Sequence, residues 1–433
     1  MKSYRTHYSK ELSRDDDGKK VTVAGWVEDI RNLGSIAFII LRDRRGTLQI
    51  TTFKKQHKEI FEKLVSLNRE SVISVRGICK ANEKVRNGYE IIPEKVEILS
   101  LADAPLPMGV VDKVNVEMDT RLDNRFIDLR REEVRAIFLI RDSLINSARE
   151  FLRKNGFIEV HTPKIIASAS EGGTNLFRVK YFEKDGYLAQ SPQLYKQMLM
   201  ATGLDRVYEI GWYFRAEEHN TRRHLNESTA IDIEMAFIKN EGDVMKILER
   251  LVQHICKRIY KMEELSILNV DIRVPSLPLP RLKYEDVLDI LKEKGFELQW
   301  GEDLGSEEER AIGEVMREEG KDFYFITKYP LDAKPFYTMP DGSLSRSFDL
   351  GCKGIEIASG SQRIHDYELL RERIEKNGLK PEDFQDYLKA FKYGMPPHGG
   401  FGLGIERLLM ALLDIKNVRE CILFPRDRTR LRP

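Results

Sequence analysis

The sequence predicts an α+β fold in two domains, a small N-terminal β-barrel and a larger domain whose antiparallel sheet is flanked by helices. Three observations predict it. Short β-rich runs crowd the beginning of the chain, two prolines, Pro105 and Pro107, then interrupt it, and the rest alternates strand-like runs with amphipathic segments of helical period. The length of 433 residues also exceeds what one hydrophobic core usually holds.

The first domain, residues 1–105, is expected to be a five-stranded barrel of the OB type. Its strand-like runs are VTVAGWV, AFIILRD, GTLQIT, SVISVRGIC and GYEIIPEKVEIL, with one helical patch at EIFEKLVSLN. It carries 20 Lys and Arg against 15 Asp and Glu, whereas the rest of the chain carries 51 against 55. This basic excess is compatible with nucleic-acid binding, but also with an ordinary solvated surface.

The larger domain is expected over residues 132–433, after a charged linker at residues 106–131. It begins with a long amphipathic helix from Glu132 to Asn155, which ends at Gly156, a residue type favoured just beyond a helix C-terminus. The runs RVYEIGWYF and TAIDIEMAFI are predicted strands. Further helices are expected at about residues 242–261 and 404–414.

Composition excludes several classes of protein. Apolar residues make up 41% and charged residues 33%, which is typical of a globular protein. No apolar run is long enough for a membrane span, and no secretory signal is present, so we expect a cytoplasmic protein without membrane association. The four cysteines form no CxxC pair and no HExxH occurs, so neither a disulfide framework nor a zinc site is expected.

A charged loop, FRAEEHNTRRHLNE, joins the two predicted strands of the larger domain. Nucleoside triphosphates need fixed cations at the phosphates and a carboxylate that accepts from the adenine amino group, and this loop offers both. A solvated charged hairpin would explain any one of its residues but not the whole pattern. The glycine-rich GGFGLGIER is weaker, since a tight loop before a helix explains it equally well, and no GxxxxGK[ST] loop occurs.

Three segments together resemble the signature motifs of class II aminoacyl-tRNA synthetases: GFIEVHTPKI motif 1, FRAEEHNTRRHLNE motif 2 and GGFGLGIERL motif 3. With SEGGTNLF, AQSPQLYKQ, DLGCKGIEIASGSQR, YGMPPHGG and LFPRDRTRLRP, the resemblance covers nearly the whole chain and points to the aspartyl branch of subclass IIb, archaeal and eukaryotic type. It implies a class II catalytic domain behind an OB-fold anticodon-binding domain. It also implies a homodimer, because the segment with Pro163 resembles the motif that builds the twofold interface.

The activity that this resemblance implies is ATP-dependent ligation of L-aspartate to tRNA-Asp through an aspartyl-adenylate, with Mg²⁺ accompanying ATP. No side-chain nucleophile is required, since positioning and electrostatics carry both steps. Two other classes of function are alternatives, a tRNA-independent amide ligase of the asparagine synthetase kind and a catalytically silent RNA-binding paralogue. The N-terminal barrel argues against the first, and Arg215, Glu356, Arg363 and Arg407 argue against the second.

Aspartate presents two carboxylates and one ammonium, so its site needs two cations and at least one anion. By resemblance, Lys196 and Arg363 hold the side-chain carboxylate, and asparaginyl enzymes have an acidic residue in place of this lysine. A buried core histidine stays an alternative for His398. The resemblance places around the aspartate Glu171, Ser191, Gln193, Lys196, Arg215, Asp232, Ser359, Arg363 and His398.

For ATP, the resemblance assigns Arg215 to the α-phosphate, Glu217 to adenine and Arg407 to the γ-phosphate and the adenine face, with Arg215 and Arg407 as the catalytic pair. Ser228 departs from the pattern, because many aspartyl enzymes have a phenylalanine there that stacks on adenine. The remaining ATP-binding residues are Ala216, Arg223, His224, Leu225, Glu356, Gly404, Ile405 and Glu406. The implied magnesium ligands are Asp349, Glu356 and Ser359.

For tRNA, Arg31, Phe38 and Gln49 match anticodon-contacting positions, and OB barrels commonly stack bases on such an aromatic side chain. The apolar neighbours of Phe38 leave open whether it faces RNA or the barrel core. Glu28 and Arg86 stand where archaeal relatives distinguish acceptance of tRNA-Asp alone from acceptance of tRNA-Asn as well. They match neither pattern, so the choice between tRNA-Asp and both tRNAs stays open.

Overall fold

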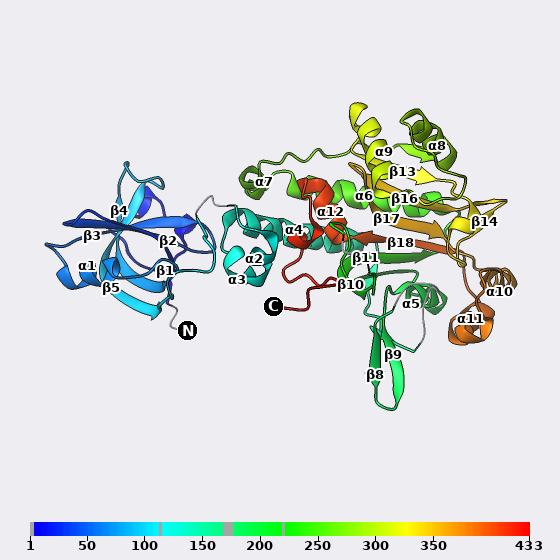
Figure 1. The fold of residues 1–433 in the computed structure, drawn as a ribbon, viewed down its shortest axis with the longest axis horizontal. Helices are drawn as coiled ribbons and strands as arrows, with labels where there is room; N and C mark the ends of the chain where they lie inside the picture. The colour runs from blue at the N-terminus through cyan, green and yellow to red at the C-terminus, as the bar shows by residue number, and fades with distance from the viewer. Residues whose placement is uncertain (1–3, 112–114, 168–175, 219–220) are drawn as a thin grey trace. The chain divides into compact units, whose positions relative to one another are not determined.

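The computed structural model describes residues 4–111, 115–167, 176–218 and 221–433. The chain divides into two compact units, Met1–Glu117 and Met118–Pro433 (Figure 1). The range predicted as a linker contains two short helices, α2 (Met118–Asp123) and α3 (Arg125–Asp128). Within the described ranges, no helix is both long enough and apolar enough to cross a membrane.

The first unit is a closed barrel of five strands in the order β1-β2-β3-β5-β4, which confirms the predicted five-stranded barrel. A helix, α1 (Lys58–Val65), lies between the third and fourth strands in the chain, where the helical patch was predicted. The strands are β1 (Lys20–Asn32), β2 (Ile36–Arg42), β3 (Thr47–Phe53), β4 (Val72–Ala81) and β5 (Tyr89–Ser100).

The barrel core decides which way Phe38 points. Ala37, Ile39 and Leu41 are almost completely buried and belong to the barrel's apolar cluster. Because successive side chains of a strand point to opposite faces, Phe38 lies on the outer face of the barrel, where it is half-buried. The interpretation of Phe38 as a core residue is therefore wrong.

The second unit is built on an eight-stranded sheet, in the order β12-β13-β16-β17-β18-β11-β10-β6. Its neighbouring strands are antiparallel except at the two edges, where β12 pairs with β13 and β6 with β10 in parallel. The bounds are β6 (Ile158–Glu159), β10 (Arg206–Phe214), β11 (Glu227–Ala236), β12 (Arg281–Lys283), β13 (Phe323–Thr327), β16 (Ser347–Cys352), β17 (Ile355–Gln362) and β18 (His398–Gly404).

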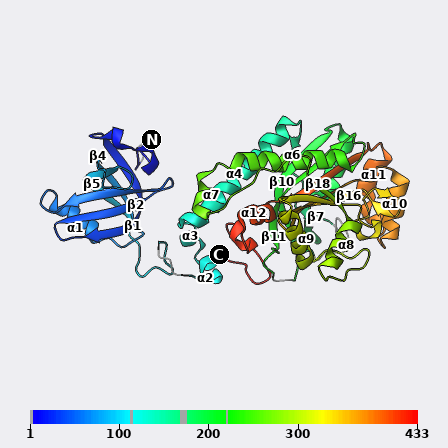
Figure 2. The same cartoon turned by 90° about the horizontal axis from the view of Figure 1, so that it is seen from above.

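Helices cover one face of this sheet. Figure 2 shows α4 (Glu132–Lys154) and α6 (Glu241–Ile259) running alongside one another, and both contribute to the largest apolar core together with α12 (Ile405–Leu413). These three helices were predicted, because each has apolar side chains at helical spacing. Their burial leaves the opposite face of the sheet available for a binding site.

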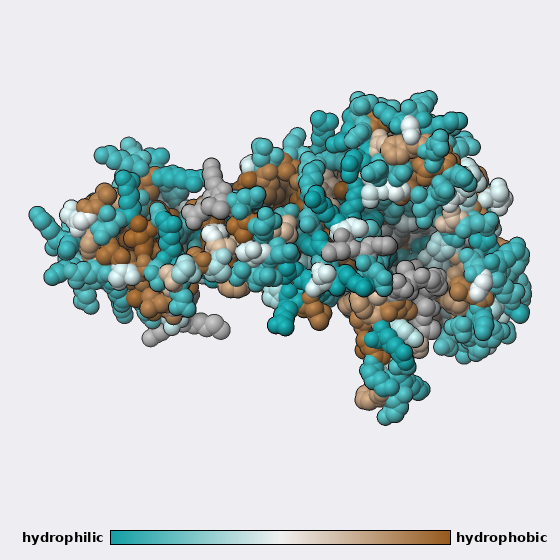
Figure 3. All heavy atoms as spheres, in the orientation of Figure 1, coloured by the Kyte–Doolittle hydropathy of each residue, from teal (hydrophilic) through white to brown (hydrophobic). Residues whose placement is uncertain are grey.

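Smaller elements surround the sheet. A three-stranded sheet comprises β7 (Ile165–Ile166), β8 (Arg178–Tyr181) and β9 (Lys184–Leu188), and its β8–β9 hairpin projects from the unit (Figure 1). The surface over α10 (Tyr367–Lys376) and α11 (Gln385–Lys392) is mainly hydrophilic on the face shown in Figure 3. The other elements are α5 (Gln193–Met198), α7 (Glu263–Leu268), α8 (Tyr284–Glu293), α9 (Ser306–Glu318), β14 (Pro340–Asp341) and β15 (Leu344–Ser345).

The glycine-rich segment before α12 is a strand, β18, so its interpretation as a tight loop is wrong. Glycines are normally depleted in strands, but here β17 and β11 pair with it on both sides. A Cβ atom at Gly400 would lie 2.1 Å from the carbonyl oxygen of Ile233 and 2.2 Å from Glu234 Oε2. The glycine is needed because a buried carboxylate approaches the backbone at this point.

Candidate active site

Two carboxylates, Asp232 and Glu234, lie on the open face of the sheet, and Asp232 lines a cavity there. Ile231 and Ile233 of β11 point into the helical core, so the alternate residues Asp232 and Glu234 point to the other face. Gly402 and Gly400 of β18 stand opposite these two carboxylates in the strand register. Without side chains of their own, these glycines leave room for the carboxylates.

Two buried cations balance these carboxylates. Lys196, from α5, places Nζ 2.8 Å from Asp232 Oδ1 and 3.7 Å from Glu234 Oε2. Arg363, just after β17, donates from Nε to Glu234 Oε1 at 3.0 Å and from Nη1 to Ser361 Oγ at 2.7 Å. Lys196 is 3% exposed and Arg363 4%, so the four charges form one desolvated cluster.

Glu234 was not among the predicted site residues, although it contacts both cations and is completely buried. The signal available in the sequence was a second carboxylate two positions after Asp232 on an otherwise apolar strand. A buried carboxylate is stable only when it is paired, so its presence implied a cation nearby.

A cavity of about 300 Å³ lies over this charge cluster. Gln193 Nε2 is buried there without a hydrogen-bond partner among the described residues, and it can donate to a bound ligand. Predicted residues that line the cavity are Ser191, Gln193, Arg215, Asp232, Glu356, Ser359, Arg363, Gly404 and Arg407. The structure thus brings most of the predicted aspartate site together, whereas Glu171 lies outside the described residues.

His398 is placed differently. Its imidazole is completely buried, with Nδ1 2.9 Å from the Pro396 carbonyl oxygen and Nε2 3.2 Å from Gln197 Oε1. Burial lowers the pKa of His398 to about 4, so the ring is neutral at physiological pH. His398 is not among the described residues that line the two cavities. Its surroundings are those of a hydrogen-bonded histidine in the core.

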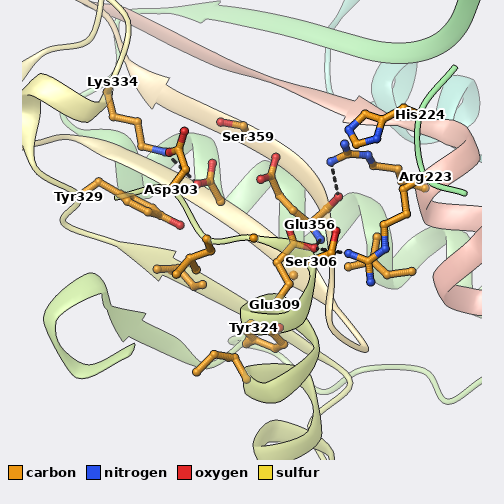
Figure 4. Close-up of a pocket in the computed structure, with 18 residues that line it drawn as sticks. Arg223, His224, Asp303, Ser306, Glu309, Tyr324, Tyr329, Lys334, Glu356 and Ser359 are labelled. Carbon is orange, nitrogen blue, oxygen red and sulfur yellow. Dashed lines mark hydrogen bonds and ion pairs between the residues drawn. The ribbon is translucent and has the colours of Figure 1, made fainter. Parts of the chain in front are cut away.

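A second cavity, of about 370 Å³, adjoins the first and shares Glu356, Ser359 and Arg407 with it. Figure 4 shows Arg223 and His224 on one side of this cavity and Lys334 on the other, with carboxylates between them. Arg407 Nη1 donates to the carbonyl oxygen of Glu356 at 3.2 Å. The cavity therefore presents cations around a group of oxygen ligands.

Asp349 and Glu356 of this second cavity are carboxylates at close quarters. Lys334 Nζ lies 2.9 Å from Asp349 Oδ2, whereas Asp349 Oδ1 is buried without a partner among the described residues. Burial and the charge of Asp349 raise the pKa of Glu356. Ser359 stands opposite Asp349 in the strand register. A hard divalent cation binds carboxylate oxygens of this kind, which repel one another and include one without a hydrogen-bond partner among the described residues, together with phosphate oxygens.

This oxygen set is sparse. No group of three or more His, Cys, Asp or Glu residues suited to a metal ion occurs among the residues that the structure describes. A cation held here would need further ligands from its substrate, as Mg²⁺ commonly does.

The charged loop between β10 and β11 closes a third, smaller hollow of about 30 Å³, lined by Glu217, Leu225 and Ser228 among others. Tyr213 lines it too and stands opposite Ser228 in the strand register. The guanidinium carbon of Arg215 lies 5.2 Å from the centroid of the Tyr213 ring. An aromatic face is thus supplied by the strand that neighbours Ser228.

Three predicted ATP-binding residues contribute mainly by position. Ile405 is completely buried, and Ala216 is half-buried in the charged loop. Glu406 lines the small hollow but is buried, and it accepts from Arg141 Nη1 at 2.8 Å and from the Thr229 N–H at 3.1 Å. These contacts anchor the start of α12, from which Arg407 reaches both cavities.

A polar patch covers part of the barrel's outer face. Arg31 stands opposite Phe38 in the β1–β2 register, and Phe38 stands opposite Thr51 in the β2–β3 register. Gln49 Nε2 donates to Thr51 Oγ1 at 3.0 Å and to Glu90 Oε2 at 3.2 Å. Glu90, which was not predicted, is buried and holds the Gln49 amide beside Phe38 and Arg31 on the outer face.

Glu28 and Arg86 have separate surroundings. Glu28 accepts from Arg42 Nη1 at 3.1 Å, and Arg42 also donates to Glu70 at 2.7 Å. Arg86 is exposed in the turn between β4 and β5. The carboxylate of Glu28 is thus committed to a buried arginine of the barrel.

Comparison with known proteins shows which proteins this chain resembles. The family model of class II tRNA synthetases (D, K and N) matches residues 117–428, and the OB-fold nucleic acid binding domain matches residues 21–99. The aspartate–tRNA(Asp) ligase of Pyrococcus horikoshii is 55% identical over 99% of this chain and all of its own length. The aspartate–tRNA(Asp/Asn) ligase of Methanopyrus kandleri is 54% identical over 98% of this chain and 99% of its own length.

A solved structure shows the same fold. The asparaginyl-tRNA synthetase of Pyrococcus horikoshii, complexed with asparaginyl-adenylate, matches with a TM-score of 0.91 at 36% identity and covers 99% of both chains. The predicted fold class, an OB-fold barrel followed by a class II synthetase domain, is confirmed.

Proposed function

The chain belongs to the class II tRNA synthetases (D, K and N), and from this premise we propose that it activates L-aspartate with ATP and transfers it to tRNA-Asp. The observation that carries the choice of aspartate is the pair of buried cations, Lys196 and Arg363, beside the cavity. We also propose that the protein acts in the cytoplasm.

The buried cations favour a carboxylate over an amide. Lys196 and Arg363 are held by Asp232 and Glu234. Arg363 and Asp232 line the cavity, and Lys196 contacts Asp232 at 2.8 Å. The carboxylate of aspartate accepts from both cations, whereas the carboxamide of asparagine would direct its NH₂ donors at one of them. An unpaired donor in a desolvated pocket costs about 1 to 3 kcal/mol, so the pocket discriminates against asparagine.

The ammonium end of aspartate would face the carboxylate and hydroxyl oxygens. Asp232 supplies the negative charge, Ser191 an oxygen, and Gln193 can donate from its unpartnered Nε2 to the α-carboxylate. Arg215 lines the same cavity and is the cation that we assign to the α-carboxylate and the α-phosphate. These contacts would hold the reacting oxygen near the phosphorus.

The phosphates of ATP would lie in the second cavity. Arg223 and His224 enter it from the charged loop, which we call the ATP loop (residues 215–225, of which 219 and 220 lie outside the described residues). Arg407 reaches both cavities and can bridge the reacting centre and the terminal phosphates. Adenine would bind against Glu217 and Arg407, with Tyr213 as the aromatic face next to Ser228.

The chemistry follows from this placement. An oxygen of the aspartate α-carboxylate attacks the α-phosphorus in line, the bond to the bridging oxygen breaks, and pyrophosphate leaves. A terminal ribose hydroxyl of tRNA then attacks the acyl carbon of the adenylate, and AMP leaves. Arg215 and Arg407 stabilise the negative charge that develops on the phosphate oxygens.

Magnesium fits the second cavity. Asp349 and Glu356, with the Ser359 hydroxyl, would hold it, since Asp349 Oδ1 is unbonded among the described residues and the two carboxylates repel one another. When bound, Mg²⁺ neutralises phosphate charge on ATP. The chain's own part is to present these oxygens beside Arg223 and Arg407.

For tRNA, the outer surface of the barrel offers a stacking and hydrogen-bonding site. Phe38 offers an aromatic face, Arg31 lies opposite it, and Gln49, held by the buried Glu90, supplies an amide for base edges. Relatives named for tRNA(Asp) and for tRNA(Asp/Asn) are similar to this chain at 55% and 54% identity, so similarity does not choose between the two ranges.

A homodimer is part of the proposal. β6 lies at an edge of the large sheet, and its Ile158 is 46% exposed. Near it in the chain, His161 and Pro163 line a groove of about 490 Å³ together with Tyr195 and Tyr393. Exposed apolar side chains beside an open sheet edge favour association with a second copy.

Aspartate-dependent exchange of labelled pyrophosphate into ATP tests the proposed activation step. We expect exchange with aspartate and Mg²⁺, and little with asparagine or lysine. Chelation of the metal should abolish it. Exchange that requires asparagine or lysine instead, or no exchange with any of the three, would refute the proposal.

A further inference from the structure

The C-terminal segment, residues 418–430, contacts the ATP loop and Asn226, the residue that follows the loop. The Val418 N–H donates to the carbonyl oxygen of Arg222 at 2.9 Å. In addition, the Asn226 N–H donates to the carbonyl oxygen of Arg426 at 2.9 Å. The segment follows α12, and its path toward the C-terminus is the red trace in Figure 1. These backbone contacts join two parts of the chain that are far apart in sequence.

Asn226 carries this contact into the ATP loop. Its Nδ2 donates to the carbonyl oxygens of Arg215 at 2.7 Å and Glu217 at 3.1 Å, and its own carbonyl accepts from the Arg215 N–H at 2.9 Å. Asn226 is only 9% exposed. One side chain therefore fixes the backbone of the two residues assigned to the α-phosphate and to adenine.

An ion pair closes the C-terminal segment on itself. Arg419 Nε lies 2.5 Å from Asp427 Oδ2, and both side chains are largely buried. Asp427 Oδ1 accepts from the N–H groups of Thr429 and Arg430, each at 2.9 Å. Burial alone would raise the pKa of Asp427, but these hydrogen bonds and Arg419 leave it below its ordinary value. Asp427 is thus an ionised anchor, and Arg419 Nη1 also reaches the Thr221 carbonyl oxygen at 3.5 Å.

The same segment is attached to α2 and α3. The buried guanidinium of Arg125 donates to the carbonyl oxygens of Ile422 at 2.9 Å and Leu423 at 3.0 Å. Arg430 pairs with Asp123 at 2.6 Å and with Asp119 at 3.1 Å. The C-terminal segment is therefore fixed both to a helical base and to the ATP loop, by contacts that alternate along its length.

We propose that the C-terminal segment is a brace that sets the conformation of the ATP loop, with Asp427 and Asn226 as positioning residues for ATP. Neither residue lines the described cavities, so each acts through the backbone of Arg215 and Glu217. The inference rests on the proposed function, because it takes the loop to bind ATP. It predicts a specific loss of ATP affinity when the brace is loosened.

The variant Asp427→Asn tests the brace, since it keeps the size of the side chain and removes its charge. In pyrophosphate exchange, KM for ATP should rise about 5- to 10-fold. KM for aspartate should rise less, by about 2-fold, because only Arg215 of the braced residues also contacts the α-carboxylate. Asp427→Glu, which restores the charge, should recover part of the loss. The matched control is Asp341→Asn. The Asp341 carboxylate pairs with Lys328 at 2.7 Å and does not contact the described residues of the ATP loop, so the KM values of this variant should stay unchanged.

Amide hydrogen exchange gives a readout that does not depend on activity. In Asp427→Asn and in Asn226→Ala, peptides covering residues 221–226 should exchange about 5-fold faster, with the barrel unchanged. The proposal that the C-terminal segment braces the ATP loop would be wrong in any of three cases: an unchanged KM for ATP, equal increases in the KM values for ATP and aspartate, or an unchanged rate of amide hydrogen exchange in the loop. If the wild-type protein shows no pyrophosphate exchange, the proposed function fails. Amide hydrogen exchange of the ATP loop then still tests whether the C-terminal segment braces the loop.

Discussion

Lys196 Nζ lies 2.8 Å from Asp232 Oδ1, and the two side chains are 4% and 11% exposed. Charges so far from water are stable only in pairs, and the pairing repeats between Arg363 and Glu234. The pocket therefore holds two cations whose charge is already balanced by the protein. The side-chain carboxylate and the ammonium of the substrate add one charge of each sign. The site therefore stays neutral beneath the α-carboxylate, which is the group that reacts.

Lys196→Leu should cripple aspartate activation. The change removes one cation and leaves Asp232 as an unpaired buried charge, which costs about 3 to 5 kcal/mol, or roughly 100-fold or more in exchange efficiency. Binding of ATP alone should change little. Lys246→Leu, on an exposed position of α6, is the matched control. Wild-type efficiency in Lys196→Leu would remove this lysine from the aspartate site.

Phe38→Ala should separate the two domains' roles. Because Phe38 lies on the outer face of the barrel, loss of its ring should raise KM for tRNA by about 5- to 150-fold, equivalent to roughly 1 to 3 kcal/mol of stacking. Pyrophosphate exchange without tRNA should stay near wild type, and the melting temperature should change little. Unaltered tRNA kinetics would exclude Phe38 from the RNA-binding surface.

Sedimentation should show a dimer at micromolar concentration. Ile158→Asp places a charge on the exposed edge strand β6 and should shift the protein toward monomers. Trp300→Asp changes an apolar residue, 55% exposed, that follows α8, which packs against β12 at the opposite edge of the sheet. This change should leave the dimer intact. A fully active wild-type monomer would contradict the dimer.

His398 predicts an acid-sensitive fold. Its pKa of about 4 in the folded protein lies below the ordinary value of 6.5, so the unfolded chain binds the proton more readily. Stability from this group is fully present above pH 6.5 and is lost as the pH falls toward 4, by about 2 kcal/mol at pH 5. Unfolding of wild type and His398→Gln, measured from pH 7 to pH 5, should give the steeper loss in wild type. Parallel profiles would show that the imidazole is not buried as a neutral group.

Much of the fold follows from local patterns. The helices α4, α6 and α12 and the strands β10 and β11 were predicted within a few residues, because apolar spacing is decided locally. β18 was not, since its glycines disfavour a strand and only its neighbours β11 and β17 stabilise it. Phe38 was ambiguous because apolar residues surround it, and closure of the barrel decides which of them are inside.

Prediction of the candidate site from the sequence was limited in the same way. Resemblance to a family supplied Lys196, Asp232 and Arg363, which the structure brings together in one cluster. Glu234 was missed because its role depends on the register of β11 with β18, which brings Gly400 opposite it. Long-range register is not written in either segment alone.

Charging of purified tRNA tests the central claim most directly. Labelled aspartate and labelled asparagine should each be offered with ATP, Mg²⁺ and purified tRNA-Asp or tRNA-Asn. The account predicts that aspartate is esterified to tRNA-Asp and that asparagine is esterified to neither tRNA. Transfer of aspartate to tRNA-Asn as well would define a broader tRNA range with the same amino-acid site. Esterification of asparagine in preference to aspartate, or no charging of tRNA-Asp with aspartate, would contradict the account.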